Sequence, residues 1–187
     1  YPKYSSFVGL YPIPLRHGMT IGELAKLFNQ LYLSQKVNLT VITMKNWQRK
    51  LWMDDTCLKW VMPSPNMATI MTSTVYPGQV FFEGTNLSEG RGTTKPFELV
   101  GAPWIDGYNL AKHLNGLNLD GVIFREAWFT PTFSKFKNQL CGGVQLHVTD
   151  RRKYRPFITT LHILNIIISK YPKKLKFHHR YFDQIMG

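Results

Sequence analysis

The chain has 187 residues, and its 44% hydrophobic and 14% aromatic content excludes an intrinsically disordered protein. Its 23 Lys and Arg residues outnumber its 11 Asp and Glu residues, so the net charge of +12 favours nucleic acid, anionic lipid or an anionic cell-wall polymer as partner. No run reaches the roughly 18 apolar residues that a membrane span needs. Cys57 and Cys141 lack metal-ligand spacing and are expected to be buried thiols.

The first part of the chain is predicted to alternate helices with strands. Thr20 and Glu23 have the spacing of a capping box, which predicts a helix that begins there. The β-branched run at residues 38–44 predicts a strand buried on both sides, as in a parallel sheet. A second apolar run, at residues 78–84, predicts a strand with Glu83 at its end, where open α/β sheets place their ligands.

Between these two strands, the Trp- and Pro-rich residues 47–65 predict a long loop, and Asn66 is expected to cap a short helix through Thr72. After Pro103 the pattern changes. We expect a helix capped by Asp106, two antiparallel strands, a helix with Pro in its first turn, and a basic tail. The predicted class is α/β, with the end of a Rossmann-like domain at residues 1–98 and a small α+β domain at residues 99–187.

Six of the 11 acids fall in one central block, and its Gly-rich turn holds the candidate site. Glu83 and Glu89 are suited to general acid–base chemistry, and Asn86 and Ser88 to hydrogen bonds with sugar hydroxyls. Glycines on both sides of Arg91 allow a sharp turn that aims its guanidinium at a carboxylate or phosphate. An internal Glu83–Arg91 salt bridge that braces the turn is an equally good interpretation from the residues alone.

Three further residues are candidates for substrate binding. Arg16 and His17 precede a helix start and offer a cation and a titratable ring near its positive end. His147 alternates with apolar neighbours in its strand, so it is expected to face away from the core. The turn DRRKYRP is predicted to be a solvated basic turn, and no group of residues has the company that a metal site requires.

The segments PIPLRHGMTIGELAKLF, PSPNMATIMTSTVYPG, FEGTNLSEGRGTTKPFELVGAPWID and CGGVQLHVTDRRKYRP resemble the NamZ (YbbC-like) exo-β-N-acetylmuramidase family over nearly the whole chain. The resemblance implies a bacterial, extracytoplasmic glycoside hydrolase that needs no cofactor or metal. It would release N-acetylmuramic acid from the non-reducing ends of peptidoglycan-derived chains. Glu83 and Glu89 would be catalytic, and Arg91 or Arg16 would bind the lactyl carboxylate of the substrate.

The family's chains are longer, and its proposed catalytic Glu lies in an N-terminal Rossmann half without a counterpart here. The chain begins at Tyr1 and stops after a helical pattern, so a fragment that is inactive by itself is expected. A non-catalytic glycan-binding module is the alternative. Nucleic acid is a weaker prediction, because the basic residues are scattered and no recognition motif is present.

Overall fold

The computed structural model describes residues 2–6, 9–14 and 16–186. The chain divides into two compact units. The smaller unit is Ile13–Lys59, and the larger unit combines Tyr1–Pro12 with Trp60–Gly187. Each unit is described by itself below.

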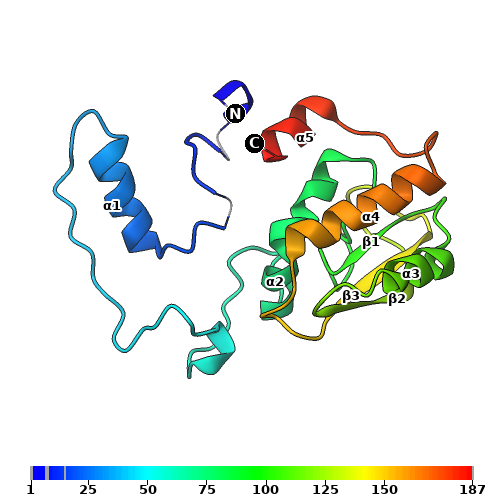
Figure 1. The fold of residues 1–187 in the computed structure, drawn as a ribbon, viewed down its shortest axis with the longest axis horizontal. Helices are drawn as coiled ribbons and strands as arrows, with labels where there is room; N and C mark the ends of the chain where they lie inside the picture. Colours follow the sequence, from blue (N-terminus) through cyan, green and yellow to red (C-terminus); the bar gives the residue numbers. More distant parts are fainter. Residues whose placement is uncertain (1, 7–8, 15, 187) are drawn as a thin grey trace. The chain divides into compact units, whose positions relative to one another are not determined.

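The smaller unit contains the helix α1 (Ile21–Leu31) and the short 3-10 helix η2 (Met53–Asp55) (Figure 1). The predicted capping box is confirmed: the Glu23 amide donates to Thr20 Oγ1 at 3.2 Å, and the Thr20 amide donates to Glu23 Oε2 at 2.8 Å. Arg49 extends this cap, since its Nη2 donates to Glu23 Oε1 at 2.6 Å. The prediction of a strand at residues 38–44 is wrong, because these residues have no regular secondary structure and pair with no strand among those described.

The larger unit is built on an antiparallel sheet of β1 (Leu99–Ala102), β3 (Cys141–Val148) and β2 (Val122–Phe129), in the order β1-β3-β2. The prediction that the last two are antiparallel neighbours is confirmed by a register running from Val122 opposite Val148 to Phe129 opposite Cys141. Val122 and Phe124 are buried on one face of β2, and Ala127 and Phe129 are buried on the other, so both faces of the strand contribute to the hydrophobic core.

Helices cover this sheet. α3 (Gly107–Gly116) packs against β2 and β3, and α4 (Pro156–Lys170) packs against α3 and α2 (Ile70–Gln79) (Figure 1). η1 (Pro2–Tyr4) and α5 (His179–Met186) complete the unit. The mixed α/β class is therefore confirmed. The core includes the fully buried side chains Val75, Phe82, Val100, Leu114, Val144 and Ile163.

Two predictions about the segment before the sheet are wrong. Residues 78–84 are not a strand: α2 continues directly into the 3-10 helix η3 (Val80–Gly84). A short apolar run is compatible with a buried strand and with a buried helical turn, and Phe81 and Phe82 are both buried in the helical form. The helix predicted from Asn66 begins instead at Ile70, where Thr69 Oγ1 accepts the Thr72 amide at 3.1 Å.

The remaining local predictions fare differently. Asp106 caps α3 as expected, because its Oδ1 accepts the Asn109 amide at 3.0 Å. Both cysteines are free thiols, and Cys141 is buried as expected, whereas Cys57 is exposed on the loop that follows η2. No helix of the described residues is long and apolar enough to cross a membrane.

Candidate functional site

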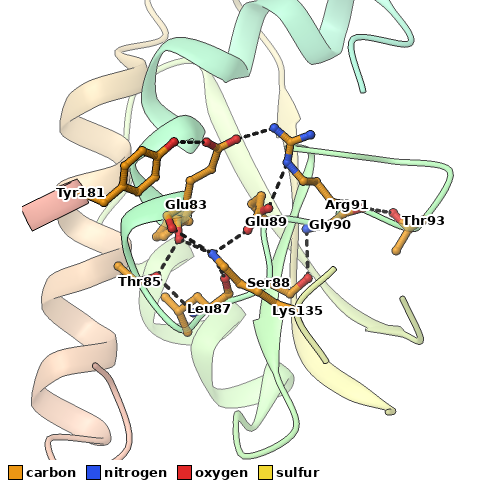
Figure 2. Close-up of polar contacts among 11 residues, drawn as sticks. Glu83, Thr85, Leu87, Ser88, Glu89, Gly90, Arg91, Thr93, Lys135 and Tyr181 are labelled. Carbon is orange, nitrogen blue, oxygen red and sulfur yellow. Dashed lines mark hydrogen bonds and ion pairs between the residues drawn. The ribbon is translucent and has the colours of Figure 1, made fainter. Parts of the chain in front are cut away.

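Four charged side chains meet beside η3, and they are called the charged cluster below: Glu83, Glu89, Arg91 and Lys135 (Figure 2). Arg91 joins the two acids. Its Nη2 lies 2.5 Å from Glu83 Oε1, and its Nε lies 3.2 Å from Glu89 Oε1. The salt bridge between Glu83 and Arg91 is therefore present. Two carboxylates and two cations leave the charged cluster formally neutral.

Lys135 forms the base of the charged cluster. Its Nζ donates to the carbonyl oxygens of Phe82 and Leu87, at 2.7 and 2.9 Å, and to Glu89 Oε2 at 2.9 Å. An ammonium has three donors, so these contacts satisfy it and fix the backbone between η3 and Glu89. Sequence reasoning missed this residue. Lys135 lies 46 positions from Glu89, in the loop between β2 and β3, and no local signal in the sequence links the two residues.

Tyr181, on α5, is the second residue that the sequence did not reveal. Its hydroxyl donates to Glu83 Oε2 at 2.9 Å, so Glu83 accepts from a phenol on one oxygen and from a guanidinium on the other (Figure 2). Burial, with the hydrogen bond to Glu83 and its charge, raises the pKa of Tyr181 to about 12. The phenol is therefore protonated and donates to Glu83 at neutral pH.

Arg91 is held from several sides. Burial acts to lower its pKa, but the hydrogen bond to Glu83 and the charges of Glu83 and Glu89 outweigh burial and raise it above its ordinary value. The guanidinium carbon also lies 5.0 Å from the centroid of the Phe97 ring, within range of a cation–π contact. Among the described residues, Nη1 of Arg91 has no hydrogen-bond partner.

The glycine prediction is confirmed by the backbone of the turn. Gly90 and Gly92 have φ angles of +79° and +82°, which L side chains rarely adopt. A Cβ on Gly92 would lie 2.6 Å from the carbonyl oxygen of Phe133, so the turn also depends on a close approach of two backbones. This sharp turn brings the Arg91 side chain back over Glu83 and Glu89.

Asn86 and Ser88 are engaged by the protein itself. Asn86 Nδ2 donates to the Lys174 carbonyl at 2.9 Å, and its Oδ1 accepts the Lys176 amide at 2.8 Å. Ser88 is 2% exposed, and its Oγ accepts the Gly90 amide at 3.2 Å. The polar groups that were expected to bind a sugar are therefore already bonded to the protein backbone, and the role of both residues in the structure is to fix that backbone.

The other candidates belong to other elements of the chain. Arg16 and His17 belong to the smaller unit, where His17 Nδ1 accepts the Met19 amide at 3.0 Å. His147 lies on β3 opposite Ile123, and its Nε2 is buried without a hydrogen-bond partner among the described residues. The contacts of the charged cluster include none of the three. No group of His, Cys, Asp and Glu in the described ranges is arranged to hold a metal ion.

Exposure separates the two acids of the charged cluster. The Glu83 and Arg91 side chains are 17% and 29% exposed, whereas Glu89 is 3% exposed with both oxygens in ion pairs. Glu83 and the outer edge of Arg91 can therefore meet a ligand. Glu89 is buried and forms an ion pair with Arg91. The strand-end location expected for Glu83 is wrong, since η3 presents it.

Two family models together match nearly the whole chain. Residues 74–187 match the family model described as exo-beta-N-acetylmuramidase NamZ, C-terminal, and residues 1–71 match the N-terminal model of that family. The chain belongs to the NamZ exo-β-N-acetylmuramidase family.

Individual relatives agree. The chain is 56% identical over all 187 residues to the peptidoglycan beta-N-acetylmuramidase NamZ of Bacillus subtilis (strain 168), and covers 45% of it. Two DUF1343 family proteins of Bacteroides fragilis NCTC 9343, known from crystal structures, also match. One is 32% identical with a TM-score of 0.91 over 99% of this chain, and the other is 31% identical with a TM-score of 0.77 over 100%. The chain covers 50% of each, so it spans about half the length of its relatives.

Proposed function

We propose that the complete protein is an exo-acting β-N-acetylmuramidase, which releases N-acetylmuramic acid from the non-reducing ends of peptidoglycan-derived chains. The observation that carries this proposal is the 56% identity, along the whole chain, to a peptidoglycan beta-N-acetylmuramidase. Such a substrate supports a location outside the cytoplasm, which is part of the proposal. The chain spans 45% of that relative, so the activity is proposed for the complete protein.

The 187 residues alone are expected to hydrolyse little. Most glycosidases need two carboxyl groups that flank the scissile bond, and in the charged cluster only Glu83 combines a carboxylate with appreciable exposure. We propose that the other carboxyl group comes from the part of the complete protein that these 187 residues do not include.

Within the site, we assign contact with the sugar to Glu83. Its oxygens are oriented by Arg91 and Tyr181, which suits a general acid–base group or a negative charge that stabilises the positive sugar ring of the transition state. Glu89, predicted with Glu83 as catalytic, is a positioning residue in this proposal. Its buried carboxylate forms ion pairs with both Arg91 and Lys135.

Arg91 is the proposed reader of the lactyl carboxylate. The edge formed by Nη1 and Nη2 is suited to two parallel hydrogen bonds with a carboxylate, and its Nη1 is without a partner among the described residues. The ion pair with Glu83 supports this role as well as a bracing one, because it fixes the guanidinium before the substrate arrives.

The test uses the product of the complete open reading frame and a muropeptide that ends in N-acetylmuramic acid. Glu83→Gln is expected to lower kcat about a hundredfold or more, in the range for loss of an acid–base group. The matched control is Asp120→Asn, an exposed acid outside the charged cluster, which should leave kcat unchanged.

The melting temperature separates chemistry from bracing. Gln keeps a hydrogen-bond acceptor for Tyr181, and the ion pair with Arg91 is partly exposed, so a loss of only about 1 kcal/mol in the free energy of unfolding is expected. Normal turnover with a large fall in melting temperature would make Glu83 a bracing residue. Binding of the muropeptide without any release by the wild type would instead identify a glycan-binding module.

A further inference from the structure

A long stretch of the larger unit carries cations without any acid. Between Asp150 and Asp183 the chain has no Asp or Glu, and it contains nine cations: Arg151, Arg152, Lys153, Arg155, Lys170, Lys173, Lys174, Lys176 and Arg180. The last part of this stretch is called the basic row below and consists of Lys173, Lys174, Lys176 and Arg180. All four residues are exposed, and within the described ranges none of them has a salt bridge.

The backbone of the basic row is fixed to the rest of the unit. The Asn86 side chain binds the Lys174 carbonyl and the Lys176 amide, and the Asn86 amide donates to the Lys176 carbonyl at 3.0 Å. The His178 amide donates to the Gly84 carbonyl at 2.8 Å. The row is therefore held to the larger unit through its backbone.

Its side chains also point in set directions. Leu175 and Phe177 pack against the core, whereas Lys174 and Lys176 are exposed, so the apolar residues face inward and the cations outward. Lys173 and Lys174 lie in a turn, Lys176 lies between that turn and α5, and Arg180 lies on α5. The row ends beside the charged cluster, since Arg180 is followed by Tyr181, which contacts Glu83 (Figure 2).

We propose that the basic row binds a linear anionic polymer that carries phosphodiester groups, of the kind found in cell walls, alongside the candidate site. Three of its four cations are lysines, which bind phosphate as point charges, and a row of them matches a chain with one negative group per repeat. The charge complementarity is strong, because no acid within the row competes for these cations.

Two other anionic partners fit less well. A membrane-surface helix would present apolar side chains for insertion, but those of this row face the core. Single-stranded nucleic acid would need an aromatic platform for stacking, and Phe177 is already packed against Phe182, with their ring centroids 4.9 Å apart. A polymer that needs only spaced cations remains the best match.

The test measures binding to soluble poly(glycerol phosphate) by the product of the complete open reading frame, without turnover, so its outcome is independent of the proposed muramidase activity. Lys174→Gln/Lys176→Gln is expected to weaken binding about tenfold or more, which is the size of effect expected when a protein loses two lysines that contact an anionic surface. The matched control is Lys112→Gln/Lys137→Gln, which removes the same charge from exposed positions outside the row and should bind as the wild type does.

Two further measurements sharpen the test. Lys174→Arg/Lys176→Arg keeps both charges and should keep the affinity, which shows that the Gln pair did not act through misfolding. Affinity for the polymer should fall as salt rises, and the glycerol phosphate monomer should bind far more weakly. Equal losses in the Gln pair and its control would overturn the proposal. So would tighter binding to phosphatidylglycerol vesicles, to DNA or to the monomer than to the polymer.

Discussion

Replacing Lys135 by Met tests whether the charged cluster is held together from beneath. The ammonium makes three hydrogen bonds of 2.7–2.9 Å, two to backbone carbonyl oxygens and one to the buried carboxylate of Glu89. Met has a similar length but no donor. The substitution therefore leaves two carbonyls without this partner, and it leaves Glu89 with Arg91 as its remaining ion-pair partner.

The size of the effect follows from these contacts. Hydrogen bonds to a charged group contribute about 1.5–3 kcal/mol each, and removal of one partner of a buried ion pair costs about 3–5 kcal/mol. These terms overlap, and the Lys135 side chain is 24% exposed, so water replaces part of what is lost. We expect a net loss of about 3 kcal/mol in the free energy of unfolding, which lowers the melting temperature by about 6–12 °C.

The assay is thermal and urea unfolding followed by circular dichroism, with Lys137→Met as the control. Lys137 is exposed in the same turn, and its substitution should change the free energy of unfolding by no more than about 0.5 kcal/mol. A double-mutant cycle of Lys135→Met with Glu89→Gln should give a coupling energy of about 0.5–3 kcal/mol. If the Lys135 and Lys137 variants unfold at the same temperature, the assignment of Lys135 as the base of the charged cluster is refuted.

Three further predictions concern the turn and its neighbours. Arg91→Lys should reduce the preference for substrates ending in N-acetylmuramic acid over N-acetylglucosamine almost as much as Arg91→Ala does, by about 1.5–3 kcal/mol, because an ammonium cannot make a two-pronged contact. Unchanged preferences in both variants would show that another cation binds the lactyl carboxylate. Gly92→Ala should lower the free energy of unfolding by more than about 1 kcal/mol in urea titrations, because φ is +82° and the new Cβ would lie 2.6 Å from a backbone carbonyl oxygen. The control Gly116→Ala has open space around its Cβ and should be neutral or slightly stabilising. The Tyr181 phenol should ionise near pH 12, so its contribution to stability is complete below pH 10 and is lost as pH rises toward 12. Burial also raises the pKa of Tyr76 and Tyr154, so absorbance at 295 nm should show several late-titrating tyrosines, of which Tyr181→Phe removes one; an unchanged titration curve in that variant would contradict the assignment.

Local features of the fold could be predicted from the sequence because a few neighbouring residues decide them. The capping box of Thr20 and Glu23 and the Asp106 cap each depend on backbone groups within four positions, and the glycines beside Arg91 are the residue type that left-handed backbone favours. The strand β3 was also predictable, because Val144, Leu146 and Val148 alternate with polar residues, and β2 was predictable as a short run rich in β-branched and aromatic residues. The turn that aims Arg91 at the acids belongs to this class of features.

Tertiary structure decided the rest. Residues 78–84 complete α2 and form η3, with Phe81 packed against Phe157 of α4, and a short apolar run does not show which partners it will meet. The roles within the site depend on contacts as distant in sequence as Lys135 with Glu89 and Tyr181 with Glu83, 46 and 98 positions apart. Only the folded chain shows that Glu89 is enclosed by cations while Glu83 stays accessible, because exposure is a property of packing and both acids look alike in sequence.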